Sequence, residues 1–323
     1  MKYNLKKLLF FAPLMTLMFC FNSPQNDEEK MQTIMISVKN TLSYLHYSPK
    51  PINDAYSADV FDKYLEMMDP AKKFLLLFDV DEFTKHKSLL DDYLNRGDIS
   101  FFNLTVDRLN ARTKEVEKLS QDILSKPINF DENEELILEP KLKAYPKNQE
   151  ELRNEWKKFI KYNILQEIET LNAKEQTQKE KKDSVNKFKL KDTIKLQILT
   201  PQQKQAKATD EVKDLLTSMF KRYDKRKKMD WFSVYMNAYT EVFDPHTNYF
   251  SPQDKEDFDV SFKGKVIGIG ATIQESKGKI KIGTLVVGAP AWKSKQISEG
   301  DEILKVKSKK DEEPINVTGM VVE

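Results

Sequence analysis

Residues 263–306 read Lys-Gly-Lys-Val-Ile-Gly-Ile-Gly-Ala-Thr-Ile-Gln-Glu, followed by a strand-turn-strand pattern, then Val-Gly-Ala-Pro-Ala-Trp-Lys-Ser and finally Glu-Gly-Asp-Glu-Ile-Leu-Lys-Val. Gly268 and Gly270 flank Ile269 directly ahead of a stretch that we expect to be extended. Closely spaced glycines let consecutive backbone N–H groups face the same way, because no Cβ restricts φ. Such a nest can hold a carboxylate, and the strand that follows can accept an extended peptide as an added strand.

Taken alone, the glycine pair also fits an ordinary hairpin turn or bulge in a small barrel. The order of the segments favours the first interpretation. Gly-Ile-Gly-Ala, then Gly-Ala-Pro-Ala, then Glu-Gly-Asp-Glu-Ile-Leu resembles the first two thirds of a PDZ domain. Within this pattern Pro290 is expected to begin a short helical turn, and Gly300-Asp301 to form a turn before a strand.

Composition divides the chain into two classes of structure. At 323 residues it is long enough for about two domains. Most of its nine glycines lie from Lys263 onward, so the long remainder is compatible with helix. The 53 basic and 51 acidic residues nearly cancel, which leaves no global field to gather nucleic acid. We therefore expect an α+β chain, with a mainly α N-terminal domain (24–262) followed by a truncated PDZ-like, β-rich module (263–323).

The first 23 residues have the pattern of a signal peptide. Lys2, Lys6 and Lys7 precede an apolar run over residues 8–21, which is too short for a span of roughly 20 residues. The prediction is export to the periplasm or cell envelope, with membrane association only through this segment. A lipid anchor at Cys20 is the less favoured alternative, because Phe19 stands where a lipoprotein signal has a small residue. Cys20 is the only cysteine, so the chain forms no internal disulfide.

Apolar residues at helical spacing dominate the sequence from Asp27 to the bridge at residues 244–252. Helices are predicted to end at residues 47–51 and at Asp69-Pro70, to run from about Asp79 to Leu94, and to begin again behind a Ser100 cap. Further helical stripes cover residues 152–171 and 232–243, and between them the helical pattern resumes by Thr209. Near residues 173–200 the chain is rich in Lys, Glu and Gln, which predicts a charged loop or a solvated helix extension.

The bridge carries a more specific resemblance. Asp244-Pro245-His246-Thr247-Asn248-Tyr249-Phe250-Ser251-Pro252, followed by Gly268-Ile269-Gly270-Ala271, resembles the tail-specific (C-terminal processing) serine proteases of the bacterial envelope. The early segment Leu45-His46-Tyr47-Ser48-Pro49 is similar to the helical N-terminal region of the larger members.

This resemblance implies a helical platform, a PDZ module that holds the free C-terminus of a substrate, and a catalytic domain with a Ser/Lys dyad. The dyad needs a lysine whose pKa is lowered by burial. Carried over residue by residue, the backbone that binds the peptide carboxylate falls on Ile267, Gly268, Ile269, Gly270 and Ala271. Strand pairing with the peptide falls on Thr272, Ile273 and Gln274.

The sequence departs from the family pattern at its end. It stops at Val321-Val322-Glu323, where a PDZ domain would enter the helix that walls its groove. No serine stands in a nucleophile-elbow or similar glycine-rich context, so no catalytic residue is assigned. His46, His86 and His246 are scattered, which predicts neither a metal site nor a cofactor. We interpret His246 as a locally bonded turn residue.

Two classes of function remain open. In the first, the chain is the non-catalytic N-terminal portion of a periplasmic tail-specific serine endopeptidase, and its partners are the C-terminal tails of substrate proteins. In the second, it is an exported helical scaffold or interaction protein with a PDZ-like module and no peptidase role. Either way, this chain alone is expected to cleave nothing.

Overall fold

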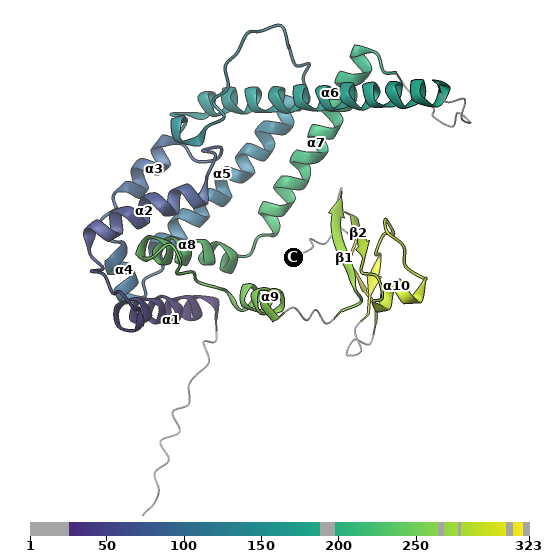
Figure 1. The fold of residues 1–323 in the computed structure, drawn as a ribbon. Coiled ribbons are helices and arrows are strands. Elements are labelled where there is room, and N and C mark those ends of the chain that lie inside the picture. Colours follow the sequence, from purple (N-terminus) through teal and green to yellow (C-terminus); the bar gives the residue numbers. More distant parts are fainter. Residues whose placement is uncertain (1–25, 188–197, 264–267, 277–278, 308–312, 319–323) are drawn as a thin grey trace, which may run out of the picture.

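The computed structural model describes residues 26–187, 198–263, 268–276, 279–307 and 313–318. The predicted signal segment with Cys20 lies outside the described residues. The fold-class prediction is confirmed, because a mainly α domain is followed by a small β-rich module (Figure 1). No helix in the described ranges is long and apolar enough to cross a bilayer.

The N-terminal domain is built from helices and two short irregular turns. These elements are α1 (Asp27–Asn40), the π-turn η1 (Thr41–Leu45), α2 (Asp54–Met68), α3 (Leu77–Thr84), α4 (Leu90–Arg96), α5 (Ser100–Leu124), the 3-10 turn η2 (Pro140–Leu142), α6 (Gln149–Lys187), α7 (Pro201–Lys225), α8 (Lys228–Phe243) and α9 (Pro252–Lys263). In Figure 1, α6 lies across the upper ends of α5 and α7.

The core of this domain is aromatic, and the hydroxyl groups of its buried tyrosines are hydrogen-bonded. Helices α2 and α8 pack side by side, so the stripe predicted over residues 232–243 is buried against α2. The hydroxyl of Tyr56 donates to the carbonyl of Tyr239 at 2.6 Å, and the Tyr239 hydroxyl donates to the carbonyl of Leu90 at 3.0 Å. Buried tyrosines with satisfied hydroxyls combine a large apolar surface with fixed geometry.

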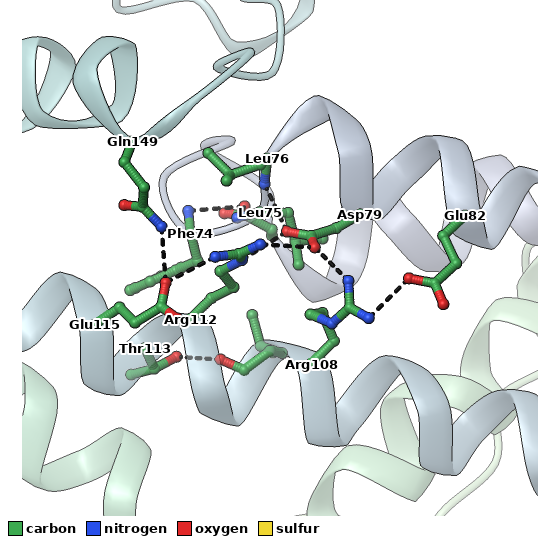
Figure 2. A network of polar contacts seen from close by, with 12 residues as sticks. Phe74, Leu75, Leu76, Asp79, Glu82, Arg108, Arg112, Thr113, Glu115 and Gln149 are labelled. Carbon is green, nitrogen blue, oxygen red and sulfur yellow. Dashed lines mark hydrogen bonds and ion pairs between the residues drawn. The ribbon is translucent and has the colours of Figure 1, made fainter.

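A buried carboxylate ties α3 to α5 (Figure 2). Asp79 is 0% exposed and lies within 2.5 Å of Nη1 of Arg108 and 2.8 Å of Nε of Arg112. Its Oδ2 also accepts the backbone N–H of Leu76 at the start of α3. Burial alone would raise the pKa of Asp79, but these donors outweigh it and hold the pKa below the ordinary value. Each charged side chain of the cluster pairs with another member of it, so we assign the cluster a structural role.

The predicted helix stop at Asp69-Pro70 is confirmed, and Asp69 does more than end α2. Its carboxylate is 1% exposed and accepts the backbone N–H groups of Lys73, Phe74 and Leu75 at 2.8–3.0 Å. These bonds fold the chain into a turn that returns Phe74 and Leu75 to the core. Asp69 therefore both ends α2 and fixes the conformation of the loop that follows it.

Two sequence predictions about helix boundaries were wrong. The helix expected from Asp79 to Leu94 is divided into α3 and α4 by the turn at residues 85–89. The division is stabilised from outside, because Ser57 Oγ accepts the Asp91 N–H at the start of α4. Ser100 is the first residue of α5 rather than its cap, and the Asp98 side chain accepts the Ser100 N–H.

The charged stretch that follows Ala173 is a helix extension as far as α6 reaches, to Lys187. Helix α7 begins earlier than the predicted Thr209. Thr200 and Gln203 form a capping box, in which Thr200 Oγ1 accepts the Gln203 N–H at 3.2 Å and Gln203 Oε1 accepts the Thr200 N–H at 2.9 Å. Pro201 occupies the first helical position, where its missing N–H is harmless.

The described residues of the β-rich module form two small antiparallel sheets and one short helix. These elements are β1 (Ala271–Ser276), β2 (Lys279–Leu285), α10 (Pro290–Ser294), β3 (Lys305–Val306) and β4 (Ile315–Asn316). The helical turn expected at Pro290 is confirmed. The far edge of β2 bonds to residues 300–303, so β2 lies between β1 and that segment.

Candidate functional site

The glycine loop at residues 268–270 enters β1 and is held against the start of α10. The carbonyl of Ile269 accepts the N–H of Ala291 at 2.8 Å, and the carbonyl of Gly270 accepts the N–H of Val286 at 2.9 Å. Gly270 has φ +75°, and a Cβ added there would lie 2.0 Å from Cβ of Ala289. Only glycine fits this position, both by conformation and by space.

The N–H side of the same loop has no partner within the part of the chain that the structure describes. Among the described residues, nothing accepts a hydrogen bond from the backbone N–H of Gly268, Ile269 or Gly270. With its carbonyls bonded inside the module and its donors unused, the loop is suited to an anion. Gly268 has open space around it, with no atom within 4 Å of an added Cβ. Ile267, the first residue of the predicted site, lies outside the described residues.

Strand β1 continues from the loop and has one edge available. Ile273 and Gln274 pair with Ile282 and Lys281 of β2, and no other described strand pairs with β1. Thr272 lies at an irregularity in the register, where its Oγ1 accepts the N–H of Thr284 at 2.7 Å. Ala271 follows Gly270 directly, so the predicted carboxylate and strand-pairing residues within the described ranges are contiguous.

Two segments far apart in the sequence meet at the exit of the helical domain. We call the contact of His46, Tyr47, Asp244 and Thr247 the clasp. His46 Nε2 lies 3.2 Å from Oγ1 of Thr247, and the Tyr47 hydroxyl donates to Asp244 Oδ2 at 3.0 Å. These are two of the segments on which the sequence resemblance rested, and the structure brings them together.

His246 belongs to the turn beside the clasp. Its backbone N–H donates to Asp244 Oδ1 at 2.7 Å. This bond and the one from Tyr47 hold the pKa of the Asp244 carboxyl below its ordinary value. The arrangement agrees with a locally bonded turn residue.

Sequence reasoning missed a second clamp, just after the clasp. The side chain of Asn237 accepts the N–H of Tyr249 at 2.7 Å and donates to its carbonyl at 3.1 Å. The connection from α8 to α9 is therefore held at both of its ends. An asparagine on an aromatic helix face is the only local signal for this clamp.

The described residues offer little other chemistry. No three His, Cys, Asp or Glu side chains among them are placed to share a metal ion. Burial lowers the pKa of Lys73 to about 8, but its ammonium lies 3.3 Å from the ring centroid of Phe159 rather than beside a serine. Lys73 therefore has the lowered pKa that a Ser/Lys dyad needs, but it packs on an aromatic ring and has a structural role.

Comparison with known proteins matches this chain to a family model and to a curated relative. The family model described as the tail specific protease N-terminal domain matches residues 38–253. A curated relative, the tail-specific protease of Haemophilus influenzae, is 28% identical over 286 residues. That alignment covers 87% of this chain and 36% of the relative, so the chain spans about a third of the relative's length.

Proposed function

Since the chain belongs to the tail-specific protease N-terminal domain family, we propose that it is the front part of a serine endopeptidase of the bacterial envelope that recognises substrate proteins by their C-termini. In this proposal the helical domain is the platform and the β-rich module, as a partial PDZ domain, holds the substrate tail. The peptide bond is broken by residues that lie outside this chain.

One observation carries the proposal. The loop at residues 268–270 has three backbone N–H groups without an acceptor among the described residues, directly ahead of a strand with an unpaired edge. A terminal carboxylate can accept from the loop while the residues before it pair with β1. Exposed apolar side chains at Ile269 and Ile273 flank this path. An internal peptide segment has no carboxylate at that place, which gives the preference for chain ends.

A peptide titration tests the proposal. Two fluorescent peptides share an apolar C-terminal sequence, one ending in a free acid and one in an amide. The acid is expected to bind weakly, on the order of millimolar or about 4 kcal/mol, since each charge-assisted bond contributes only part of its roughly 1.5–3 kcal/mol after the peptide is ordered. The amide is expected to bind more weakly still. Equal affinities for the two peptides would rule out the carboxylate nest.

Two glycine variants locate the site. Gly270→Val places a branched side chain against Ala289 and should remove the preference for the acid. Gly268→Ala adds a methyl group to open space and should keep it. The matched pair tests whether the fit of Gly270 against Ala289 sets the acid preference. An acid preference that survives in Gly270→Val would move the site away from Gly270.

We also propose that the chain is exported, on the basic residues Lys2, Lys6 and Lys7 ahead of the apolar run at 8–21. Fractionation of cells that express the full chain should place it in the envelope or periplasm. Recovery from the cytosol with Met1 intact would contradict export. A variant with Lys6 and Lys7 changed to Glu is the control, and it should be exported less.

A further inference from the structure

The connection between α5 and α6 forms an exposed segment that is fixed at both ends. We call residues 135–142 the strap. Just before it, Glu134 pairs with Lys161 of α6 at 2.6 Å. Just after it, the carbonyl of Pro146 accepts the N–H of Leu77 at 2.8 Å. In Figure 1 this connection arches away from the helices.

The strap presents an unpaired edge. No hydrogen bond from any described residue reaches the backbone of residues 135–138. Glu139 is extended, with φ −76° and ψ 113°. The side chains of Ile137, Leu138 and Leu142 are 51%, 61% and 75% exposed. A stretch with unused N–H and C=O groups and exposed apolar side chains, which leads into the extended residue Glu139, can be a template for another strand.

A cavity of about 590 Å³ lies beside the strap, between it, α2 and α3. That volume is within the range of binding pockets, which hold roughly 300–1,000 Å³. Its apolar lining comes from Phe61, Leu65, Val80, Pro140 and Tyr145. A side chain of a strand paired with the strap therefore has an apolar pocket next to it.

The charges around this site favour a cationic partner. Glu66, Glu135 and Glu139 form no ion pair within the described part of the chain. Lys141 is the one lysine of the cavity lining that, within those residues, has neither an ion pair nor a hydrogen bond. Lys72 also keeps its charge, because its ammonium donates to the neutral carbonyl of Lys143. Three unpaired carboxylates against two unpaired ammonium groups still leave a local excess of negative charge.

We propose that the strap and the cavity bind an extended segment of another polypeptide that has an apolar centre and basic flanks. The segment pairs with the backbone of residues 135–138, places an apolar side chain in the cavity and sets its basic residues against Glu135 and Glu139. Backbone pairing supplies affinity and the pocket supplies selectivity. This site uses no chain end, so it is separate from the glycine loop and goes beyond the function proposed above.

The test uses the full chain and a fluorescent nine-residue peptide, Lys-Lys-Val-Tyr-Val-Leu-Val-Lys-Lys, acetylated and amidated so that it offers no terminal carboxylate. Ile137→Asn should weaken its binding by about tenfold, the loss expected for roughly one well-packed contact. Ile198→Asn is the matched control, because Ile198 is also exposed, at 59%, and also lies outside a helix. The control should bind like the unchanged chain. Equal binding by both variants, or no binding to the unchanged chain, would overturn the proposal.

Two modified peptides separate the parts of the interaction. N-methylation of alternate residues removes the N–H groups needed for pairing and should weaken binding by about tenfold, as for one or two hydrogen bonds. Replacing the four lysines by glutamates should abolish binding. An N-methylated peptide that binds as well as the parent would overturn backbone pairing.

The other occupant to exclude is a second copy of this chain. Sedimentation velocity without peptide should show a species whose mass does not rise with concentration. A dimer that disappears in Ile137→Asn would assign the strap to self-association and overturn the proposal. Because Ile137 is exposed, the thermal unfolding of the variant should match that of the unchanged chain.

Discussion

Asp69 and Asp79 are both almost completely buried, and their pKa values move in opposite directions. For Asp69, desolvation raises the pKa and prevails over three backbone N–H donors and the more distant Lys143. For Asp79, the guanidinium groups of Arg108 and Arg112 prevail over desolvation and lower the pKa. Burial alone therefore does not decide the protonation of a carboxyl group, and charged donors within bonding distance do.

The Asp79 cluster predicts a pH-dependent part of the stability. Because the folded-state pKa of Asp79 is below its unfolded value, near 4, its stabilisation is present at neutral pH and is lost as the pH falls through the folded-state value. Asp79→Asn should lower the free energy of unfolding at pH 7 by about 3 kcal/mol, the low end for breaking a buried pair, since both guanidinium groups still reach water.

Urea unfolding at pH 7 and pH 3 measures this effect. The difference between Asp79→Asn and the unchanged chain should shrink at pH 3. Asp62→Asn is the control, because Asp62 is 64% exposed in its pair with Lys87 and should change stability by less than about 1 kcal/mol. A difference that is the same at both pH values would show that the charge of Asp79 is not what stabilises the contact between α3 and α5.

At this scale the sequence revealed local roles and not distant partners. Asp69 was correctly predicted as a helix stop, and Asp79 only as the place near which a helix starts. The arginines that bind Asp79 lie 29 and 33 residues further along, where nothing local signals the contact. For the same reason the glycines of the loop were found from their spacing, while the approach of Ala289 to Gly270 was not.

At the scale of elements, helix α7 illustrates what a local signal can do. Thr200, Pro201 and Gln203 form a start signal that sequence analysis could have read, and the prediction placed the helix only by Thr209. The division of α3 from α4 is different, because Ser57, 34 residues before Asp91, stabilises it. Propensity favours one continuous helix there, and tertiary contacts override it.

The capping box of α7 should contribute measurably to stability. Thr200→Ala removes the acceptor for the Gln203 N–H and should lower the free energy of unfolding by about 1 kcal/mol. Thr217→Ala, in the interior of the same helix, is the matched control and should be close to neutral, since its hydroxyl only bonds back to the carbonyl of Lys213. Chemical denaturation checks both. Equal losses in the two variants would show that the box does not cap α7.

At the scale of the whole molecule, the core of the helical domain is completed by α8, which lies late in the sequence of the domain. Helix α8 packs against both α1 and α2, and the clasp joins His46 to Thr247 across 201 residues of sequence. Helices that are close in sequence thus do not complete the core among themselves. The sequence predicted the helices and the two classes of structure, but hydrophobic stripes do not state which helix pairs with which.

Two shortened chains test this closure. A chain that ends at Lys263 retains α1 to α9 and should give a helix-dominated circular dichroism spectrum and a cooperative thermal transition. A chain that ends at Lys225 lacks α8, so Tyr56 and Tyr64 of α2 lose their contacts with Tyr239 and Tyr235. It should show no cooperative transition. Cooperative melting of the shorter chain at the same temperature would refute the closing role of α8.

The clasp also sets an order of events in time. A ribosome delivers His46 about 200 residues before Thr247, which is an interval of roughly 10–40 s at 5–20 residues per second. During that interval the inner faces of α1 and α2 have no α8 to cover them, and loop closure over such a length is slow. A chain whose synthesis stops before α8 would therefore be an aggregation-prone fragment rather than a smaller folded domain. Until α8 emerges, the nascent chain keeps these apolar faces of α1 and α2 exposed.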